Sequence, residues 1–406
     1  MLDKITKKKP FKYTQPEAEP KFSALYQRHI ALAAKAQIVP FAGYLMPLWY
    51  SSISAEHNAV RTTAGLFDCT HMGVLEIAGS GAEQFLNTIT VNNVSVLATG
   101  QAQYSYILDY AGNVLDDIII YRRANGLFML VVNAANELKI KTWLGTMQNA
   151  PLIKDLKDPD DSGDDAKVDL AIQGPASIEY LEKLTTADLK KLKPFTFLET
   201  RIAGIDAIIS NSGYTGAKVG FELFVHPAKA PSLWDKLIAS GAVPCGLGAR
   251  DSLRIEAGLP LYGHEIAGKF NISPFELGYG WTVKLDKEFF IGKTVMQDKI
   301  STFNMQVVRV KLPGTRGIRP VRQDDALLAD NGKCIGHILS CARAGENQIA
   351  LAYIKKQYTN RDSSANIYYL ARNQSQLQNG KKDKVQIGDI LEPDINGIIV
   401  NRFEKF

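Results

Sequence analysis

Short apolar-rich runs separated by polar turns fill the middle of the N-terminal half of the chain. Turns that contain Gly and Asn separate three such runs, at residues 102–108, 114–122 and 127–132. Short apolar runs bounded by turn residues are typical of buried strands, and short Gly/Asn turns join antiparallel neighbours. The pattern predicts a β-meander, with a helix over 82–89 before it and helical character through Trp143 after it. Ser80 and Glu83 have the spacing of a capping box at the start of the first helix.

Strand and helix patterns alternate in the next part of the chain. A strand is expected over 168–172, with a helix after Gly174 and Pro175, and a second strand–helix unit covers 203–237. Residues 154–165 are rich in Asp, Gly and Ser and predict a surface loop.

From residue 305 onward the pattern contains only short strands, which is typical of a small barrel. We expect these strands at 306–311, 334–340, 349–354 and 366–370, with a polar loop over 373–384. The chain is therefore predicted to be a multidomain α+β protein, with antiparallel and mixed sheets and a C-terminal β-barrel. We place a flexible lead-in at 1–25, a main region at 26–295 and the barrel at 300–406.

Composition narrows the class of protein. The chain has 406 residues, of which 46% are hydrophobic and 22% charged, which is ordinary for a soluble globular protein of two or three domains. It has no apolar run of the ~20 residues that a membrane helix needs, and its first twenty residues lack the apolar core of a secretory signal. A cytoplasmic location without membrane binding is therefore expected. Nucleic-acid binding is not expected, because the net charge of +5 is mild and dispersed and no binding motif accompanies it.

The cysteines give no indication of a disulfide framework or a zinc site. The four cysteines are widely spread and do not have the spacing of a zinc site. We expect them to be reduced and structural, although Cys334 and Cys341 could approach one another across strands. His71 has no partner at ligand spacing and is interpreted as a core or hydrogen-bonding histidine.

The segment 246–266 concentrates charge in a short predicted helix, which Gly258 ends. Arg250 and Arg254 lie four residues apart and so share one helix face. Two guanidinium groups on one face suit a planar anion such as a carboxylate. A solvated helix face with local ion pairs is the alternative, and the spacing alone does not decide between them.

Asp116 and Asp117 stand within an apolar predicted strand. Successive side chains of a strand point to opposite faces, so the two carboxylates are not expected to serve one site together. Burying either one costs several kcal/mol by rough estimate unless it is hydrogen-bonded or neutralised. Both faces of the strand are apolar, so the pattern does not choose between a functional carboxylate and an ion pair with a nearby arginine.

Seven blocks of sequence follow one another in a recognisable order. They are P-F-A-G-Y-L-M-P-L-W-Y at 40–50, H-N-A-V-R-T-T-A-G-L-F-D-C-T-H-M-G at 57–73, N-V-L-D-D-I-I-I-Y at 113–121, L-A-I-Q-G-P at 170–175, G-Y-T-G at 213–216 with F-E-L-F-V at 221–225, the 246–266 segment, and F-I-G-K at 290–293. Over roughly residues 25–355 the chain resembles the aminomethyltransferase (T-protein) family of the glycine cleavage system. The resemblance implies three domains around a central cavity, two of them intertwined and folate-binding.

The resemblance also implies roles for single residues. Asp116 matches the family's catalytic aspartate, which engages the nucleophilic pterin nitrogen of tetrahydrofolate, and leaves Asp117 a structural role. Glu222 matches the residue that recognises the aminopyrimidine edge of the pterin, and Arg250 the arginine at the carboxylate end of folate. The other positions that match the lining of the folate cavity are Tyr104, Met72, Asn133 and Tyr214, with Arg402 as a contact from the tail. Arg254 and Glu256 are expected to be internal scaffolding of their helix.

Two departures from the family pattern stand out. Ala217 occupies the position after G-Y-T-G where relatives carry an acidic residue, and this loop is one residue longer, so the register between Tyr214 and Glu222 is open. The region after residue 355 matches only loosely.

The partners implied are tetrahydrofolate as co-substrate and the lipoylated H-protein, with no metal, and we expect a bacterial enzyme that is a monomer or weak dimer. Two alternatives stay open within the superfamily. One is a folate-dependent demethylase of a small methylated compound. The other is a non-catalytic folate-binding accessory protein, although that branch carries a Lys-Gly-Cys motif and this chain has only Gly332-Lys333-Cys334.

Overall fold

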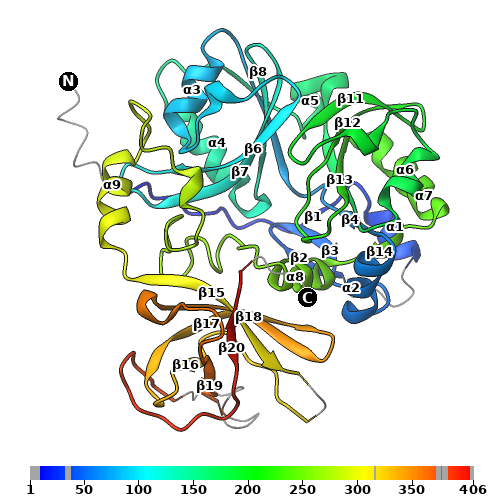
Figure 1. The fold of residues 1–406 in the computed structure, drawn as a ribbon. Coiled ribbons are helices and arrows are strands. Elements are labelled where there is room, and N and C mark those ends of the chain that lie inside the picture. The colour runs from blue at the N-terminus through cyan, green and yellow to red at the C-terminus, as the bar shows by residue number, and fades with distance from the viewer. Residues whose placement is uncertain (1–9, 33–37, 315–316, 372–375, 377–382, 403–406) are drawn as a thin grey trace. The chain divides into compact units, whose positions relative to one another are not determined.

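The computed structural model describes residues 10–32, 38–314, 317–371, 376 and 383–402. The chain folds into two compact units (Figure 1). The N-terminal unit comprises Met1–Arg250 and Thr282–Met296, and the C-terminal unit comprises Asp251–Trp281 and Gln297–Phe406. The three-part division made from the sequence stays a prediction, and residues 1–9 of its lead-in lie outside the described residues.

The first sheet of the N-terminal unit contains the predicted meander. Its five strands run in the order β6-β7-β8-β5-β9. Their bounds are β5 Gly73–Ala78, β6 Gln101–Leu108, β7 Val114–Ala124, β8 Leu127–Val132 and β9 Leu152–Asp155. The meander is confirmed, but β9 and the short helix α5 (Pro159–Ser162) occupy part of the expected loop over 154–165.

Two helices pack on one face of this sheet. The helix α3 spans Ala82–Ile89, as predicted, and α4 spans Glu137–Gly145. The capping box is wrong, because the residue that caps α3 is Gly81 and no side chain bonds the first turn. Leu86 of α3 and Trp143 of α4 bury their side chains in one cluster with Ile118 and Ile120 of β7. This face of β7 is therefore helix-covered.

The second sheet has six strands in the order β11-β12-β13-β10-β4-β14. Their bounds are β4 Gly65–Asp68, β10 Val168–Gln173, β11 Phe197–Ile202, β12 Ile205–Ser210, β13 Gly220–Val225 and β14 Val243–Cys245. The helices α6 (Ser177–Glu182) and α7 (Ala230–Ser240) pack on one face through Leu181 and Trp234. A hydrogen bond of 2.7 Å between His29 and Asp68 lies on the same side, where His29 is in ring contact with Trp234.

The remaining elements of the N-terminal half are short. A three-stranded sheet combines β1 (Lys21–Phe22), β3 (Tyr44–Pro47) and β2 (Ile38–Phe41). In sequence, the helix α1 (Tyr26–Leu32) lies between β1 and β2, and α2 (Ile53–Thr62) follows β3. Further along the chain, α8 spans Leu247–Glu256. His71 is buried and in ring contact with Phe41 and Tyr44, which confirms its interpretation as a core histidine.

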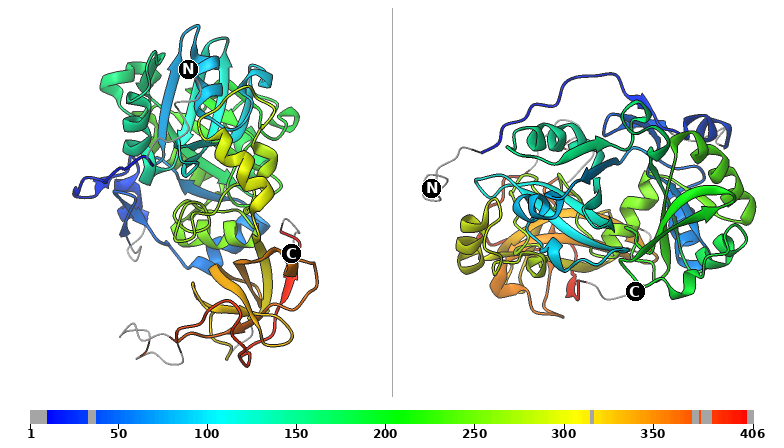
Figure 2. Two further views of the ribbon diagram at one scale, coloured as in Figure 1. Left: turned by 90° about the vertical axis from the view of Figure 1, so that its left-hand side faces the viewer. Right: turned by 90° about the horizontal axis from the view of Figure 1, so that it is seen from above.

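The faces of the two large sheets that lack helices pack against each other. One apolar cluster joins Val74, Tyr121 and Val131 of the first sheet to Ile208 and Phe224 of the second. The view from above in Figure 2 shows the two sheets side by side, with helices on their outer faces. Packing sheets through their apolar faces buries both at once. The inner cluster between the two sheets is therefore apolar.

The C-terminal unit is built on a six-stranded antiparallel sheet, curled into a half-barrel, in the order β19-β16-β17-β18-β15-β20. Its strands are β15 Met305–Pro313, β16 Ala326–Leu328, β17 Cys334–Ala344, β18 Asn347–Lys355, β19 Asn366–Tyr368 and β20 Ile398–Val400, and α9 (Lys293–Thr302) precedes them. The predicted strands are confirmed. Most of the expected loop over 373–384 lies outside the described residues.

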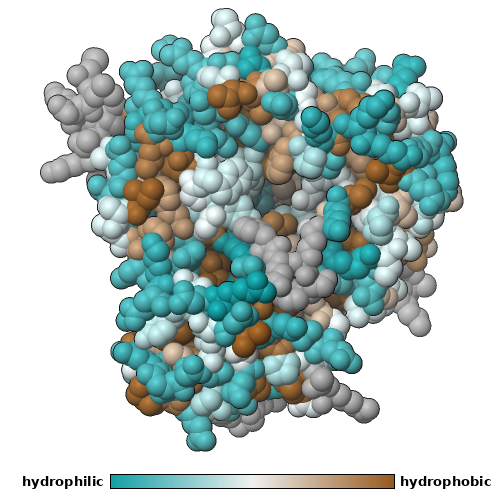
Figure 3. Space-filling view, in the orientation of Figure 1, coloured by the Kyte–Doolittle hydropathy of each residue, from teal (hydrophilic) through white to brown (hydrophobic). Residues whose placement is uncertain are grey.

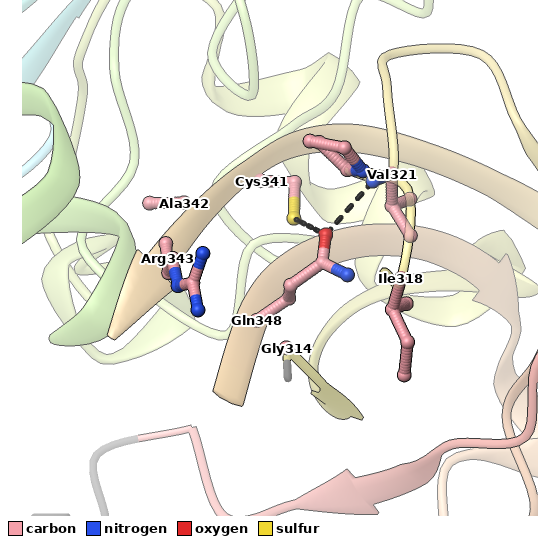
Figure 4. Close-up of a pocket in the computed structure, with 8 residues that line it drawn as sticks. Gly314, Ile318, Val321, Cys341, Ala342, Arg343 and Gln348 are labelled. Carbon is pink, nitrogen blue, oxygen red and sulfur yellow. Dashed lines mark hydrogen bonds between the residues drawn. The ribbon is translucent and has the colours of Figure 1, made fainter. Parts of the chain in front are cut away.

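The idea that Cys334 and Cys341 approach one another across strands is wrong, because both stand on the single strand β17. A pocket beside this strand is lined by Cys341, Arg343 and Gln348, and by the loop residues Ile318 and Val321 (Figure 4). The Gln348 side-chain oxygen accepts from the Val321 amide at 2.8 Å. Burial raises the pKa of the Cys341 thiol to about 12, so the pocket holds no reactive thiolate at neutral pH.

The surface is mostly hydrophilic on the face shown in Figure 3, where apolar residues form small separate patches. Among the helices of the described residues, none is both long enough and apolar enough to cross a bilayer.

Candidate active site

Asp116 lies on β7 with no exposed surface. Its carboxylate accepts a hydrogen bond from the backbone N–H of Asn133 at 3.0 Å and from the Asn133 side-chain amide at 2.8 Å. The Asn136 amide donates a third bond at 2.5 Å. Three N–H donors compensate for much of the cost of burying the carboxylate.

Asp117 is only partly buried and lies beside the same asparagine. The Asn133 Nδ2 atom is 2.8 Å from Asp117 Oδ1 as well as 2.8 Å from Asp116 Oδ1. One amide thus contacts both carboxylates, which the alternation of faces along a single strand did not predict. Their side chains leave opposite faces of β7, but Asn133 follows the neighbouring strand β8 and its amide reaches both. The Tyr104 hydroxyl on β6 donates to Asp117 Oδ2 at 2.9 Å.

The turn that leads into α4 explains how the two asparagines converge. Asn133 directly follows β8, and Asn136 closes a single 3-10 turn, Ala134–Asn136, directly before the helix. Lys139, in the first turn of α4, donates from Nζ to Asn136 Oδ1 at 2.8 Å. Because a lysine can only donate, this contact turns the amide nitrogen of Asn136 toward Asp116.

Burial raises the pKa of both carboxyl groups, and the neighbouring charge of Asp117 raises that of Asp116 further. The folded chain therefore binds these protons more tightly than the unfolded chain. Their stabilising contribution is complete below the ordinary carboxyl pKa of 3.8 and is lost as the pH rises through the raised values.

This linkage predicts the pH dependence of stability. Between about pH 5 and about pH 8, the free energy of unfolding of Asp117→Asn is expected to fall less than that of the wild type, because one buried charge no longer forms. Urea titrations monitored by fluorescence at both pH values measure the difference. Parallel losses in the two proteins would contradict the shifted titration.

Glu222 on β13 forms a second polar centre. Its Oε2 atom accepts from the Ser212 hydroxyl at 2.5 Å and from the Tyr121 hydroxyl at 3.3 Å. The loop that carries Ser212 and Tyr214 is anchored by buried Gln173, whose side chain donates to the Ser212 carbonyl at 3.1 Å. A Cβ atom at Gly213 or Gly220 would overlap the Gln173 side chain, so these glycines let the loop close over it. The contact fixes the position of Ser212 relative to Glu222.

Arg250 on α8 lies beside this centre. Its Nη1 atom contacts Cys69 Sγ at 3.0 Å, and its guanidinium lies 5.2 Å from the centre of the Tyr214 ring. Burial alone would lower the pKa of Arg250, but Cys69, Glu222 and Asp169 raise it above its ordinary value. Asp169 is buried on β10, where burial and then Glu222 raise the pKa of its carboxyl group. Arg250 thus stands among acidic groups that hold its charge.

The strand β7 connects the two centres. Asp117 and Tyr121 are four residues apart and so point to one side of the strand, the side of the inner apolar cluster. Tyr121 reaches Glu222 across that cluster, and Met72 packs against it while partly exposed. Six of the expected site residues are thus in the N-terminal unit and partly exposed, namely Tyr104, Met72, Asn133, Tyr214, Glu222 and Arg250.

Arg402 belongs to the C-terminal unit. Its Nε atom donates to the Gly258 carbonyl at 3.1 Å, and its guanidinium lies 5.1 Å from the centre of the Tyr279 ring. In the same unit Arg254 is buried and pairs with Glu265 at 2.7 Å and with Asp251 at 2.9 Å. The expectation that Arg254 is scaffolding is confirmed, and Arg250 and Arg254 do not form a paired anion clamp in the contacts they make.

This arrangement suits the transfer of protons and the recognition of a flat polar ring. A carboxylate pair with raised pKa values can accept and return protons near neutral pH. A carboxylate beside a guanidinium can bind the donors and acceptors along one edge of a heterocycle. Within the described ranges no three His, Cys, Asp or Glu side chains are grouped to hold a metal ion.

Comparison with known proteins fixes the family. The model of the GCVT N-terminal domain matches residues 25–287. An aminomethyltransferase of Exiguobacterium sibiricum is 38% identical over 82% of this chain and 89% of its own length, and one of Desulforamulus reducens is 38% identical over 86% and 94%. The chain belongs to the glycine cleavage aminomethyltransferase family.

A solved structure of this family agrees with the fold. The aminomethyltransferase T of the glycine cleavage system from Bartonella henselae has a TM-score of 0.77 and 28% identity, and it covers 94% of this chain and 96% of that one. The predicted α+β class, the family and the aminomethyltransferase activity are confirmed.

Several residues of the candidate site were not predicted from the sequence. Asn136 and Lys139 had a signal, since N-A-A-N followed by a helix places amides and a lysine on one turn. Tyr121, Ser212, Cys69 and Asp169 had none, because each looks like an ordinary strand or loop residue until strands distant in sequence are paired.

Proposed function

We propose that the chain transfers the methylene group of the S-aminomethyl-dihydrolipoyl arm of H-protein to tetrahydrofolate. The products are 5,10-methylenetetrahydrofolate, ammonia and the dihydrolipoyl protein. The observation that carries the proposal is the strand β7, which holds the carboxylate pair at one end and reaches Glu222 through Tyr121 further along. The strand β7 thus carries Asp116 and Asp117, which can exchange protons, and Tyr121, which contacts the proposed ring-binding residue Glu222.

Glu222 is proposed to accept the N–H groups of the aminopyrimidine edge of the pterin. Arg250 is proposed to contact the same ligand. The resemblance implied the carboxylate end of folate for Arg250, but its closeness to Glu222 and Tyr214 favours the pterin carbonyl, which neighbours those N–H groups. Tyr104, Met72, Asn133 and Tyr214 are proposed to line the cavity, and Arg402 to contribute from the tail.

Asp116 is proposed to manage the proton of the attacking pterin nitrogen. A secondary amine must attack a methylene carbon held between sulfur and nitrogen, and a positioned carboxylate that takes up its proton lowers the barrier. Asp116 is buried beneath Asn133, so close approach to the substrate requires the Asn133 side chain to turn aside. Asn136 keeps the carboxylate oriented while this happens.

The test is an assay with two donors. With aminomethylated, lipoylated H-protein and tetrahydrofolate, we expect equal amounts of methylenetetrahydrofolate and ammonia, without added metal. Turnover only with small methylated amines would replace the proposal by a folate-dependent demethylase. Tight folate binding without turnover of either donor would make the protein a folate-binding accessory protein.

A further inference from the structure

The balance of the proposed reaction requires two protons to move. The methylene carbon loses its bonds to the lipoyl sulfur and to the amine nitrogen, and gains bonds to N5 and N10 of tetrahydrofolate. Both folate nitrogens lose a proton in the process. One proton ends on the departing amine, which leaves as ammonia, and the other on the lipoyl sulfur, which becomes a thiol. A single carboxylate must therefore act twice, or two acceptors must share the work.

The structure offers a second acceptor in Asp117. Unlike Asp116, which has no exposed surface, Asp117 is partly exposed. It also stands on the same side of β7 as Tyr121, which contacts Glu222. Four residues of strand place the Cα atoms of Asp117 and Tyr121 about 13 Å apart. A ligand that bonds Glu222 through its ring edge and extends along this side of β7 would bring its far nitrogens to Asp117.

The carboxylates are also coupled. One amide nitrogen, Asn133 Nδ2, lies 2.8 Å from an oxygen of each. Among the described residues, the ionisable groups that face the pair include Tyr104 and Tyr106 from β6 and Lys139 from α4. The Tyr104 hydroxyl donates to Asp117, and the nearby charge of Lys139 favours the ionised form of Asp116. A proton gained by one member of such a pair changes the proton affinity of the other.

We propose that Asp117 is a second catalytic carboxylate, which takes up one of the two folate protons while Asp116, joined to it through Asn133, governs the other. The proposal rests on the proposed function. It gives Asp117 a chemical role in place of the structural role that the family resemblance implied.

The variant Asp117→Asn tests this proposal with little disturbance of the fold. Its amide oxygen can still accept from Asn133, and its NH₂ group can donate to the Tyr104 oxygen while the Tyr104 hydroxyl turns to Tyr106, 3.2 Å away. We expect kcat to fall about 10²-fold, with the KM for tetrahydrofolate within about threefold of the wild-type value. The acidic limb of the kcat profile should move to lower pH, because removal of one like charge lowers the pKa of the remaining carboxyl group.

Glu76→Gln is the matched control. Glu76 is a buried carboxylate on β5 of the same sheet and pairs with Arg123 at 3.1 Å, away from the asparagines. Its kcat and pH profile should match the wild type. An Asp117→Asn enzyme with wild-type kcat and an unmoved acidic limb would overturn the proposal.

Failure of the proposed function gives a different result. If the wild type does not turn over aminomethylated H-protein, the proposed function is wrong. Infrared titration of the carboxyl groups then tests separately whether Asp116 and Asp117 titrate as a coupled pair. A protonated-carboxyl band whose midpoint moves to lower pH in Asp117→Asn, but not in Glu76→Gln, supports the coupled pair. A band with an unchanged midpoint overturns it.

Discussion

The Asp116→Asn enzyme is expected to lose about 10²- to 10⁴-fold in kcat, the range for removal of a positioned general base. Tetrahydrofolate affinity should change little, because Asp116 is buried and the partly exposed groups around the cavity remain. The substitution should also destabilise the fold. All three of its partners are N–H donors, and an asparagine places an NH₂ group against at least one of them. The expected loss is about 1–3 kcal/mol.

Single-turnover kinetics and urea unfolding of Asp116→Asn separate these two effects. Glu76→Gln serves again as the control, since it removes a buried carboxylate of the same sheet that has a cation as its partner. A variant that unfolds at lower urea but keeps wild-type kcat under native conditions would show that Asp116 is only structural.

The second large effect is expected for Arg250→Ala, which should weaken tetrahydrofolate binding by about 2 kcal/mol, or about 30-fold in Kd. The variant loses a donor to the ligand. It also leaves Glu222 and Asp169 without the cation that stands among them, so the site itself becomes more negative. Arg250→Lys should recover only part of the affinity, because an ammonium group lacks the planar fork of donors.

Calorimetric titration with tetrahydrofolate measures this effect. Arg201→Ala is the control, because Arg201 is an exposed arginine of β11 whose partner is Asp206. We expect wild-type affinity for the control. A wild-type Kd for Arg250→Ala would remove Arg250 from the binding site.

Most strands and helices were predictable, because the pattern of apolar and turn residues that indicates them lies within each segment of the sequence. The apolar runs over 102–132 follow directly from strands that are buried on both faces, one against the helices and the other in the inner cluster. The capping box failed because the residue at the cap position before α3 is Gly81 and not Ser80, and a glycine has no side chain that could bond the first turn. The expected loop over 154–165 failed because the short edge strand β9 has few residues and little alternation to reveal it.

The site was predictable only in part. The order of the sequence motifs predicted Asp116, Glu222 and Arg250 as site residues. All three lie in the N-terminal unit. The contact of Asn133 with both Asp116 and Asp117 was not predictable from the sequence. The alternation of faces applies to side chains of one strand, whereas the Asn133 amide comes from the residue after the neighbouring strand. The contact of Cys69 with Arg250 joins residues 181 positions apart, and no local pattern encodes such a pairing.

The most direct test of the account is a crystal structure with 5-methyltetrahydrofolate, a stable relative of the substrate. We predict the aminopyrimidine edge on Glu222, with Arg250 at the ring carbonyl, and N5 and N10 directed toward the Asp116–Asn133–Asp117 group. A pterin bound elsewhere, or turned so that its nitrogens face away from both carboxylates, would contradict the account.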